Sequence, residues 1–103
     1  MSEMIRVVAK QPGASPRTML ISNRLESLQN RVGGYIETVS VFRDIVMICN
    51  EEGKLKQMLP NFLFGFDMIV GPVVFAGVER DKLVSLKPEQ IEMVKELIEE
   101  GTI

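Results

Sequence analysis

Three short polar motifs contain the residues best suited to binding a small molecule. They are "VGGYIE", which includes Gly34 and Tyr35, "NEEGK", which runs from Asn50 to Lys54, and "LPN", which ends at Asn61. A tyrosine ring can stack on a flat ring, and glycine lets the backbone approach a ligand closely. A lysine ammonium can hold phosphate, and asparagine amides both donate and accept hydrogen bonds. Together these groups predict a binding site for a nucleotide-type ligand.

Two arginines could add positive charge to that site. Arg31 lies shortly before the glycine pair, and Arg17 belongs to the polar stretch "PGASPRT". Guanidinium groups bind phosphate through paired N–H donors. Each motif also has an ordinary structural interpretation, namely a helix end for "VGGYIE", a turn for "NEEGK" and a solvated loop for "PGASPRT". Both interpretations stay open at the level of sequence.

The composition removes most of the familiar catalytic chemistries. The chain contains no histidine and a single cysteine, Cys49. This composition therefore excludes catalysis by Ser-His or Cys-His pairs, metal sites built from histidine and internal disulfides. Glu51 and Glu52 are adjacent, and adjacent carboxylates at a strand end point to opposite sides and rarely act as a pair. We expect a protein that is not an enzyme and has no cofactor or metal, with an acidic metal site of Glu37, Glu51 and Asp67 as the alternative.

The charge distribution argues against nucleic acid as a partner, and the short apolar runs argue against a membrane. The net charge is −2, with six basic and four acidic side chains in residues 1–50 and six and ten in residues 51–103. Duplex DNA binding usually needs a denser basic face. No apolar run approaches the roughly 18 residues of a membrane helix, and the N-terminus lacks the layout of a signal peptide. We therefore expect a cytoplasmic protein.

Periodicity and turn chemistry predict the elements that must position these residues. The predicted strands cover residues 4–10, 18–22, 35–42, 45–50 and 71–79, and the predicted helices cover residues 24–32 and 88–100. Asn23 and Glu26 suit a capping box for the first helix, Gly33 or Gly34 suits its end, and Gly53 suits a turn with positive φ. Residues 1–103 are expected to form one α+β domain. Its single, mostly antiparallel sheet has ββα-ββ-β-α order with two helices packed on it.

The segment from 55 to 66 is ambiguous. Pro60 limits any helix there, while Phe62, Phe64 and Phe66 alternate along the chain. These rings predict either core packing or an exposed apolar patch for self-association or partner binding. Cys49, at the end of an apolar run, is expected to be a small buried hydrophobic residue.

Four longer stretches carry a family resemblance. They are "LESLQNRVGGYIE", "ICNEEGKLKQMLPN", "DMIVGPVVFAG" and "SLKPEQIE". Over about residues 4–98 the chain resembles small proteins of phages, plasmids and conjugative elements that are classed only as a domain of unknown function. The resemblance implies no activity. It implies an accessory gene on mobile DNA, often near counter-defence genes. The apolar "FLFGF" departs from the more basic stretch of the relatives, so any function resting on that segment is in doubt.

These observations lead to one expected function and to alternatives. The expectation is a non-enzymatic, phage-borne or mobile-element protein of the host cytoplasm that sequesters a nucleotide-type signal, as a homo-oligomeric sponge. Its ligand-binding residues would be Arg17, Arg31, Gly34, Tyr35, Asn50, Lys54 and Asn61. The alternative is an inhibitor that binds a host defence or nucleic-acid enzyme through residues 62–66 or the acidic last helix. Two further alternatives are a nucleic-acid-processing accessory factor and an enzyme.

Overall fold

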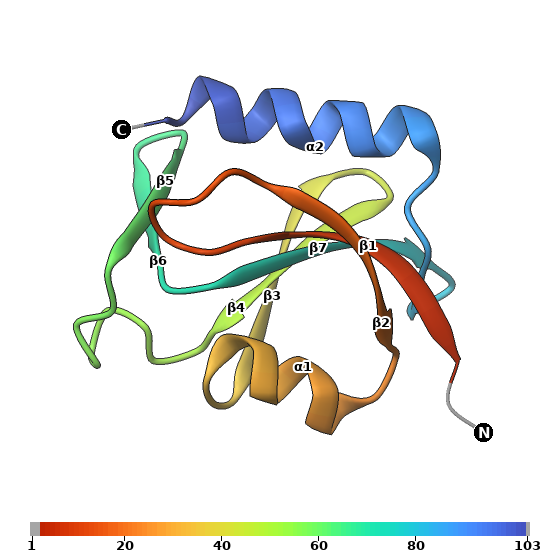
Figure 1. Cartoon of the computed structure of the whole chain (residues 1–103), viewed down its shortest axis with the longest axis horizontal. Coiled ribbons are helices and arrows are strands. Elements are labelled where there is room, and N and C mark those ends of the chain that lie inside the picture. The colour runs from red at the N-terminus through yellow and green to blue at the C-terminus, as the bar shows by residue number, and fades with distance from the viewer. Residues whose placement is uncertain (1–2, 103) are drawn as a thin grey trace.

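The computed structural model describes residues 3–102, which form a sheet with one helix on each side (Figure 1). The strands are β1 (Met4–Lys10), β2 (Arg17–Ser22), β3 (Ile36–Phe42), β4 (Ile45–Asn50), β5 (Pro60–Phe64), β6 (Asp67–Val70), β7 (Val73–Glu79) and β8 (Lys82–Val84). The helices are α1 (Leu25–Val32) and α2 (Pro88–Glu100). The predicted α+β fold with two packed helices is confirmed.

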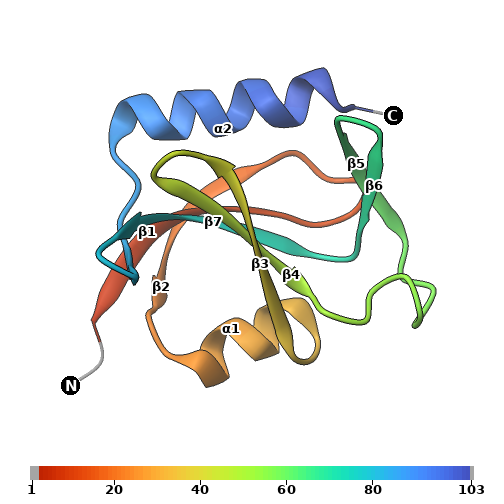
Figure 2. The same cartoon turned by 180° about the vertical axis from the view of Figure 1, so that it is seen from behind.

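The main sheet is antiparallel and has the order β2-β1-β7-β4-β3, with β8 pairing to β7. β7 is central because its run from Val73 to Gly77 is buried on both faces, as is most of β4. β5 and β6 form a separate two-stranded sheet at one end of the molecule (Figures 1 and 2). β6 and the hairpin that it makes with β5 were not predicted from the sequence.

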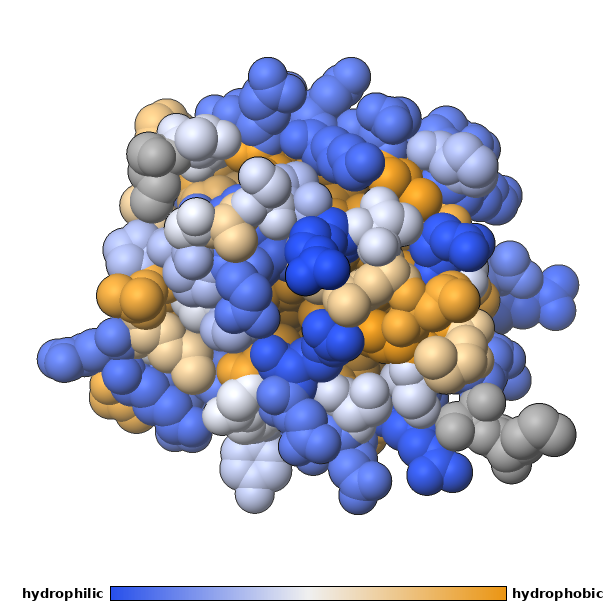
Figure 3. Space-filling view, in the orientation of Figure 1, coloured by the Kyte–Doolittle hydropathy of each residue, from blue (hydrophilic) through white to orange (hydrophobic). Residues whose placement is uncertain are grey.

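Each helix covers one face of the sheet and closes its own hydrophobic core, as the two opposite views show (Figures 1 and 2). Under α2, Val94 and Ile98 pack with Met47, Phe62 and Phe75. The core under α1 consists of Ile5, Val7, Ile21, Leu28, Val32, Ile48, Val74 and Ala76. The alternation of strand side chains assigns neighbouring residues to opposite cores. The outer surface of α2 is polar, as Figure 3 shows.

The end of α1 agrees with its prediction, whereas its start does not. Gly33 ends α1 in the left-handed conformation with φ of 81°, as predicted. The predicted capping box of Asn23 and Glu26 is wrong, because the N-cap is Arg24 and no side chain caps the helix. Asn23 instead donates from Nδ2 to the Leu83 carbonyl at 3.0 Å, so a contact with β8 uses the amide that sequence reasoning assigned to the cap.

The turn after β4 also differs from its prediction. Gly53 does not have a positive φ, and the left-handed residue of this segment is Gln57, with φ of 54°. Glycine is needed at 53 for a different reason, since a Cβ there would lie 2.9 Å from Cγ2 of Val70. The ambiguous segment resolves into this turn followed by β5, in which Phe62 is wholly buried, whereas Phe66 at the hairpin tip is exposed.

Candidate functional site

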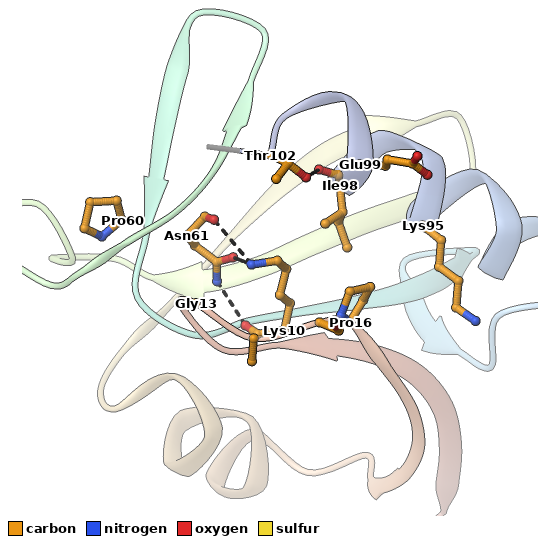
Figure 4. Close-up of a pocket in the computed structure, with 11 residues that line it drawn as sticks. Lys10, Gly13, Pro16, Pro60, Asn61, Lys95, Ile98, Glu99 and Thr102 are labelled. Atoms are coloured by element: carbon orange, nitrogen blue, oxygen red, sulfur yellow. Dashed lines mark hydrogen bonds between the residues drawn. The ribbon is translucent and has the colours of Figure 1, made fainter.

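A pocket of about 740 Å³ opens between the β1–β2 turn, the start of β5 and the C-terminal half of α2 (Figure 4). The lining residues are Lys10, Gly13, Ala14, Ser15, Pro16, Pro60, Asn61, Lys95, Ile98, Glu99 and Thr102. The end of α2 is fixed to β5 because the Leu63 amide donates to the Gly101 carbonyl at 2.8 Å. This volume lies within the range of about 300–1,000 Å³ that is usual for small-molecule sites.

The most unusual group in this pocket is the buried ammonium of Lys10. Lys10 is the last residue of β1 and only 8% exposed. Its Nζ donates to Asn61 Oδ1 at 2.7 Å, to the Asn61 carbonyl at 3.3 Å and to the Gln11 carbonyl at 3.4 Å. All three acceptors are neutral oxygens. Within residues 3–102 the only salt bridge joins Lys54 to Asp67, so no described carboxylate neutralises Lys10.

Burial of an unneutralised ammonium has an electrostatic cost. Desolvation lowers the pKa of the Lys10 amine below its usual value of 10.5, because the charged form loses hydration. A lysine is almost never fully buried unless it is paired. A bound anion at the pocket would return the missing negative charge, so the arrangement favours anionic ligands. Lys95, partly buried on α2, lines the same pocket and adds positive charge.

Asn61 holds Lys10 in place. Asn61 is 3% exposed, and its side-chain Nδ2 donates to the Lys10 carbonyl at 3.0 Å and to the Gly71 carbonyl at 2.8 Å. With Oδ1 accepting from Lys10 Nζ, both ends of the amide are occupied. In Figure 4 dashed lines mark the hydrogen bonds that join Lys10 and Asn61. Asn61 therefore positions the cation and connects the β5–β6 hairpin to β1.

The "VGGYIE" and "NEEGK" motifs meet at one point. A Cβ at Gly34 would lie 2.9 Å from Asn50 Nδ2, so the glycine permits this close approach. Asn50 is buried and donates from Nδ2 to the Val32 carbonyl at 3.1 Å, while its Oδ1 accepts from the Glu52 amide at 2.7 Å. The Asn50 amide thus ties the end of α1 to the turn after β4.

The other predicted residues lie around separate depressions. Gly34 and Tyr35 line a shallow one with Lys56, and the Tyr35 side chain is exposed. Lys54 lines another and pairs with Asp67, both side chains being exposed. Arg31 lines a third with Arg24 and Asn30. Arg17 is exposed at the start of β2, directly after Pro16 of the Lys10 pocket. Of the predicted ligand-binding residues, Asn61 alone is a lining residue of that pocket.

The sequence analysis did not identify three residues that line this pocket, namely Lys10, Lys95 and Glu99. One signal for Lys10 was available, since strand alternation places it on the same face as Val8, the face that α2 covers. A lysine at a core-facing position is a buried polar group that needs an explanation. The contact with Asn61 carried no such signal, because the two residues lie 51 positions apart in the sequence.

The remaining candidates from the sequence are Cys49 and the acidic residues. Cys49 is buried, as predicted. Burial and the neighbouring Glu37 carboxylate raise the pKa of the Cys49 thiol to about 11, so it is a poor nucleophile. Among the described residues no cluster of three or more acidic or cysteine ligands could hold a metal ion.

No helix in the described part of the chain is long and apolar enough to cross a membrane.

Comparison with known proteins places the chain in a family. No curated protein matches the chain, and neither does any solved structure. The family model named DUF3846, a domain of unknown function, matches residues 5–99. The chain, which this match covers almost from end to end, therefore belongs to the DUF3846 family.

Proposed function

We propose that this protein captures a small anionic, nucleotide-type ligand in the Lys10 pocket and holds it without chemical change. The observation that carries the proposal is the buried Lys10 ammonium, which faces the pocket and has only neutral oxygens as partners. A phosphate group supplies the missing negative charge and can accept a charge-assisted hydrogen bond from Lys10 in place of one of its two longer bonds, those to the Asn61 and Gln11 carbonyls. The ligand's phosphate would lie against Lys10, and Lys95 would add positive charge to the same pocket.

The walls of the pocket suit the rest of a nucleotide. Pro16 and Pro60 line the pocket with apolar surface on either side of the Lys10–Asn61 contact (Figure 4). A flat ring can lie against such surfaces while its polar atoms keep hydrogen bonds. The pocket volume of about 740 Å³ is many times the volume of one water molecule, so the pocket has room for a ligand of nucleotide size.

Sequestration rather than catalysis is supported by the residues available. The chain has no histidine, and the pocket's only carboxylate among the described lining residues is Glu99, so it offers no carboxylate pair for acid–base work. The mobile-element setting that the family resemblance implies fits a counter-defence protein that removes a host signal. Assembly into a homo-oligomer is part of the proposal, since subunits of a symmetric oligomer can share binding sites.

Calorimetry of the purified protein against mononucleotides, cyclic dinucleotides and ADP-ribose tests this proposal. At least one of these ligands should bind, and Lys10→Met should weaken that binding at least tenfold. Lys82→Met is the matched control, because Lys82 is exposed on β8 outside the pocket. Mass spectrometry should recover the ligand intact. An absence of heat and of thermal shift with every ligand would overturn the proposal, and recovery of a converted product would replace capture with catalysis.

A second candidate function, inhibition of a host protein, is favoured by the apolar side chains outside the core. Phe66 at the tip of the β5–β6 hairpin is fully exposed, and Leu55 and Leu59 are largely exposed. Large exposed apolar side chains often mark contact surfaces for other proteins. Capture of a host enzyme from lysate by the natural protein, with loss of capture in Phe66→Ser, would support this candidate. Equal capture by both would exclude Phe66 from the contact.

A further inference from the structure

The Lys10 pocket contains a carboxylate that a simple anion site would not need. Glu99 lies one helical turn after Lys95 on α2 and lines the pocket with it (Figure 4). Within residues 3–102, the Glu99 side chain forms no salt bridge and no hydrogen bond. Its charge would repel a plain phosphate, because like charges at short range disfavour each other. The pocket is therefore lined by two groups of opposite charge from different elements, the Lys10 ammonium of β1 and the Glu99 carboxylate of α2.

Lys10 and Glu99 place opposite demands on one ligand. Lys10 calls for an anionic group. Glu99 has two free oxygens that can only accept hydrogen bonds, so it calls for N–H donors, ideally two side by side. Pro16 lies among the lining residues as apolar surface for a flat ring. A ligand that satisfies all of these groups carries a phosphate at one end and paired N–H donors on a ring at the other.

From this arrangement we infer that the pocket selects a guanine nucleotide. Guanine presents a ring N–H and an exocyclic amino group next to each other, and these two donors match the two oxygens of one carboxylate. Adenine offers its amino donor beside a ring acceptor, which a carboxylate would repel. Uracil offers a single N–H between two carbonyl oxygens. This inference rests on the proposed function and adds the identity of the base to it.

Glu99 would act as the specificity residue, and Lys10 as the affinity residue. A carboxylate that accepts two hydrogen bonds from the correct base rejects a base that lacks one donor, since a desolvated oxygen is then left without a partner. Because Glu99 is exposed, the discrimination should be moderate. Removal of one donor from the ligand should weaken binding about tenfold, the usual effect of one hydrogen bond to a charged group.

The test compares GMP, IMP and AMP by calorimetry, since IMP differs from GMP only by lacking the amino donor. GMP should bind about ten times more tightly than IMP and more tightly still than AMP. In Glu99→Gln the preference of GMP over IMP should shrink to about threefold or less, while phosphate-dependent binding persists. Glu92→Gln is the matched control, because Glu92 is an exposed α2 residue that does not line the pocket.

The outcomes separate this inference from the function on which it rests. Equal binding of GMP, IMP and AMP would overturn the guanine preference, while capture of nucleotides would stand. A guanine preference that persists unchanged in Glu99→Gln would overturn the role of Glu99. A failure of these three nucleotides, cyclic dinucleotides and ADP-ribose to bind at all would overturn both, since no nucleotide capture would remain.

Discussion

The contact between Asn61 and Lys10 leads to a quantitative prediction for Asn61→Leu. Leucine keeps the branch at Cγ but removes three hydrogen bonds, two to backbone carbonyls and one from the Lys10 ammonium. The two neutral bonds contribute about 1 kcal/mol each, and the bond to the charged donor contributes about 2 kcal/mol. The free energy of unfolding should therefore fall by about 4 kcal/mol, a large part of the roughly 5–15 kcal/mol of a typical domain.

Urea titration followed by far-ultraviolet circular dichroism measures this free energy, since the chain has no tryptophan to report by fluorescence. Asn30→Leu is the matched control, because Asn30 is exposed on α1 and its side chain forms no hydrogen bond among the described residues. The control should change stability by no more than about 0.5 kcal/mol. A loss below about 1 kcal/mol in Asn61→Leu would refute the argument that this amide fixes the cation.

Asn61→Asp separates the structural contact from the charge of the pocket. The aspartate keeps an acceptor beside Lys10 Nζ and gives the ammonium a counter-ion, but it loses the donors to the Lys10 and Gly71 carbonyls. Its carboxylate should neutralise the pocket and weaken binding of a phosphate-bearing ligand at least tenfold in calorimetry. Undiminished binding in a folded Asn61→Asp protein would show that the Lys10 charge does not attract the ligand.

Three other features can be tested by unfolding measurements. Gly101→Ala should lower stability by about 2 kcal/mol, because a Cβ there would lie 1.9 Å from the Leu63 carbonyl oxygen; an unchanged urea midpoint would contradict this packing. The pKa of the Cys49 thiol is raised from 9.0 to about 11 by burial and by Glu37, so the unfolded chain loses this proton first. Stability should therefore fall as pH rises from 9.0 to about 11, and Cys49→Ala should remove that component. The lowered pKa of Lys10 has the opposite sign: the unfolded chain keeps its proton longer, so this component raises stability as pH approaches 10.5, and it should be absent from Lys10→Met.

The sequence by itself determined most of the elements. Continuous apolar runs predicted the central strands, because strands covered on both faces cannot alternate with polar residues. The last helix was marked by Pro88 in its first turn and by the apolar spacing of Val94 and Ile98. Local rules failed where a distant contact replaced a local one, as when Asn23 bonded to Leu83 on β8 instead of capping α1.

Only the tertiary structure decided which polar residues share a pocket. The sequence grouped Asn61 with Tyr35 and Lys54, whereas the fold places Asn61 against Lys10 and sets the other two around separate depressions. The physical reason is the route of the chain: the β5–β6 hairpin leaves the main sheet and packs beside the end of β1 and the end of α2. No local pattern encodes that packing, because it depends on which buried donors and acceptors find one another after the strands have paired.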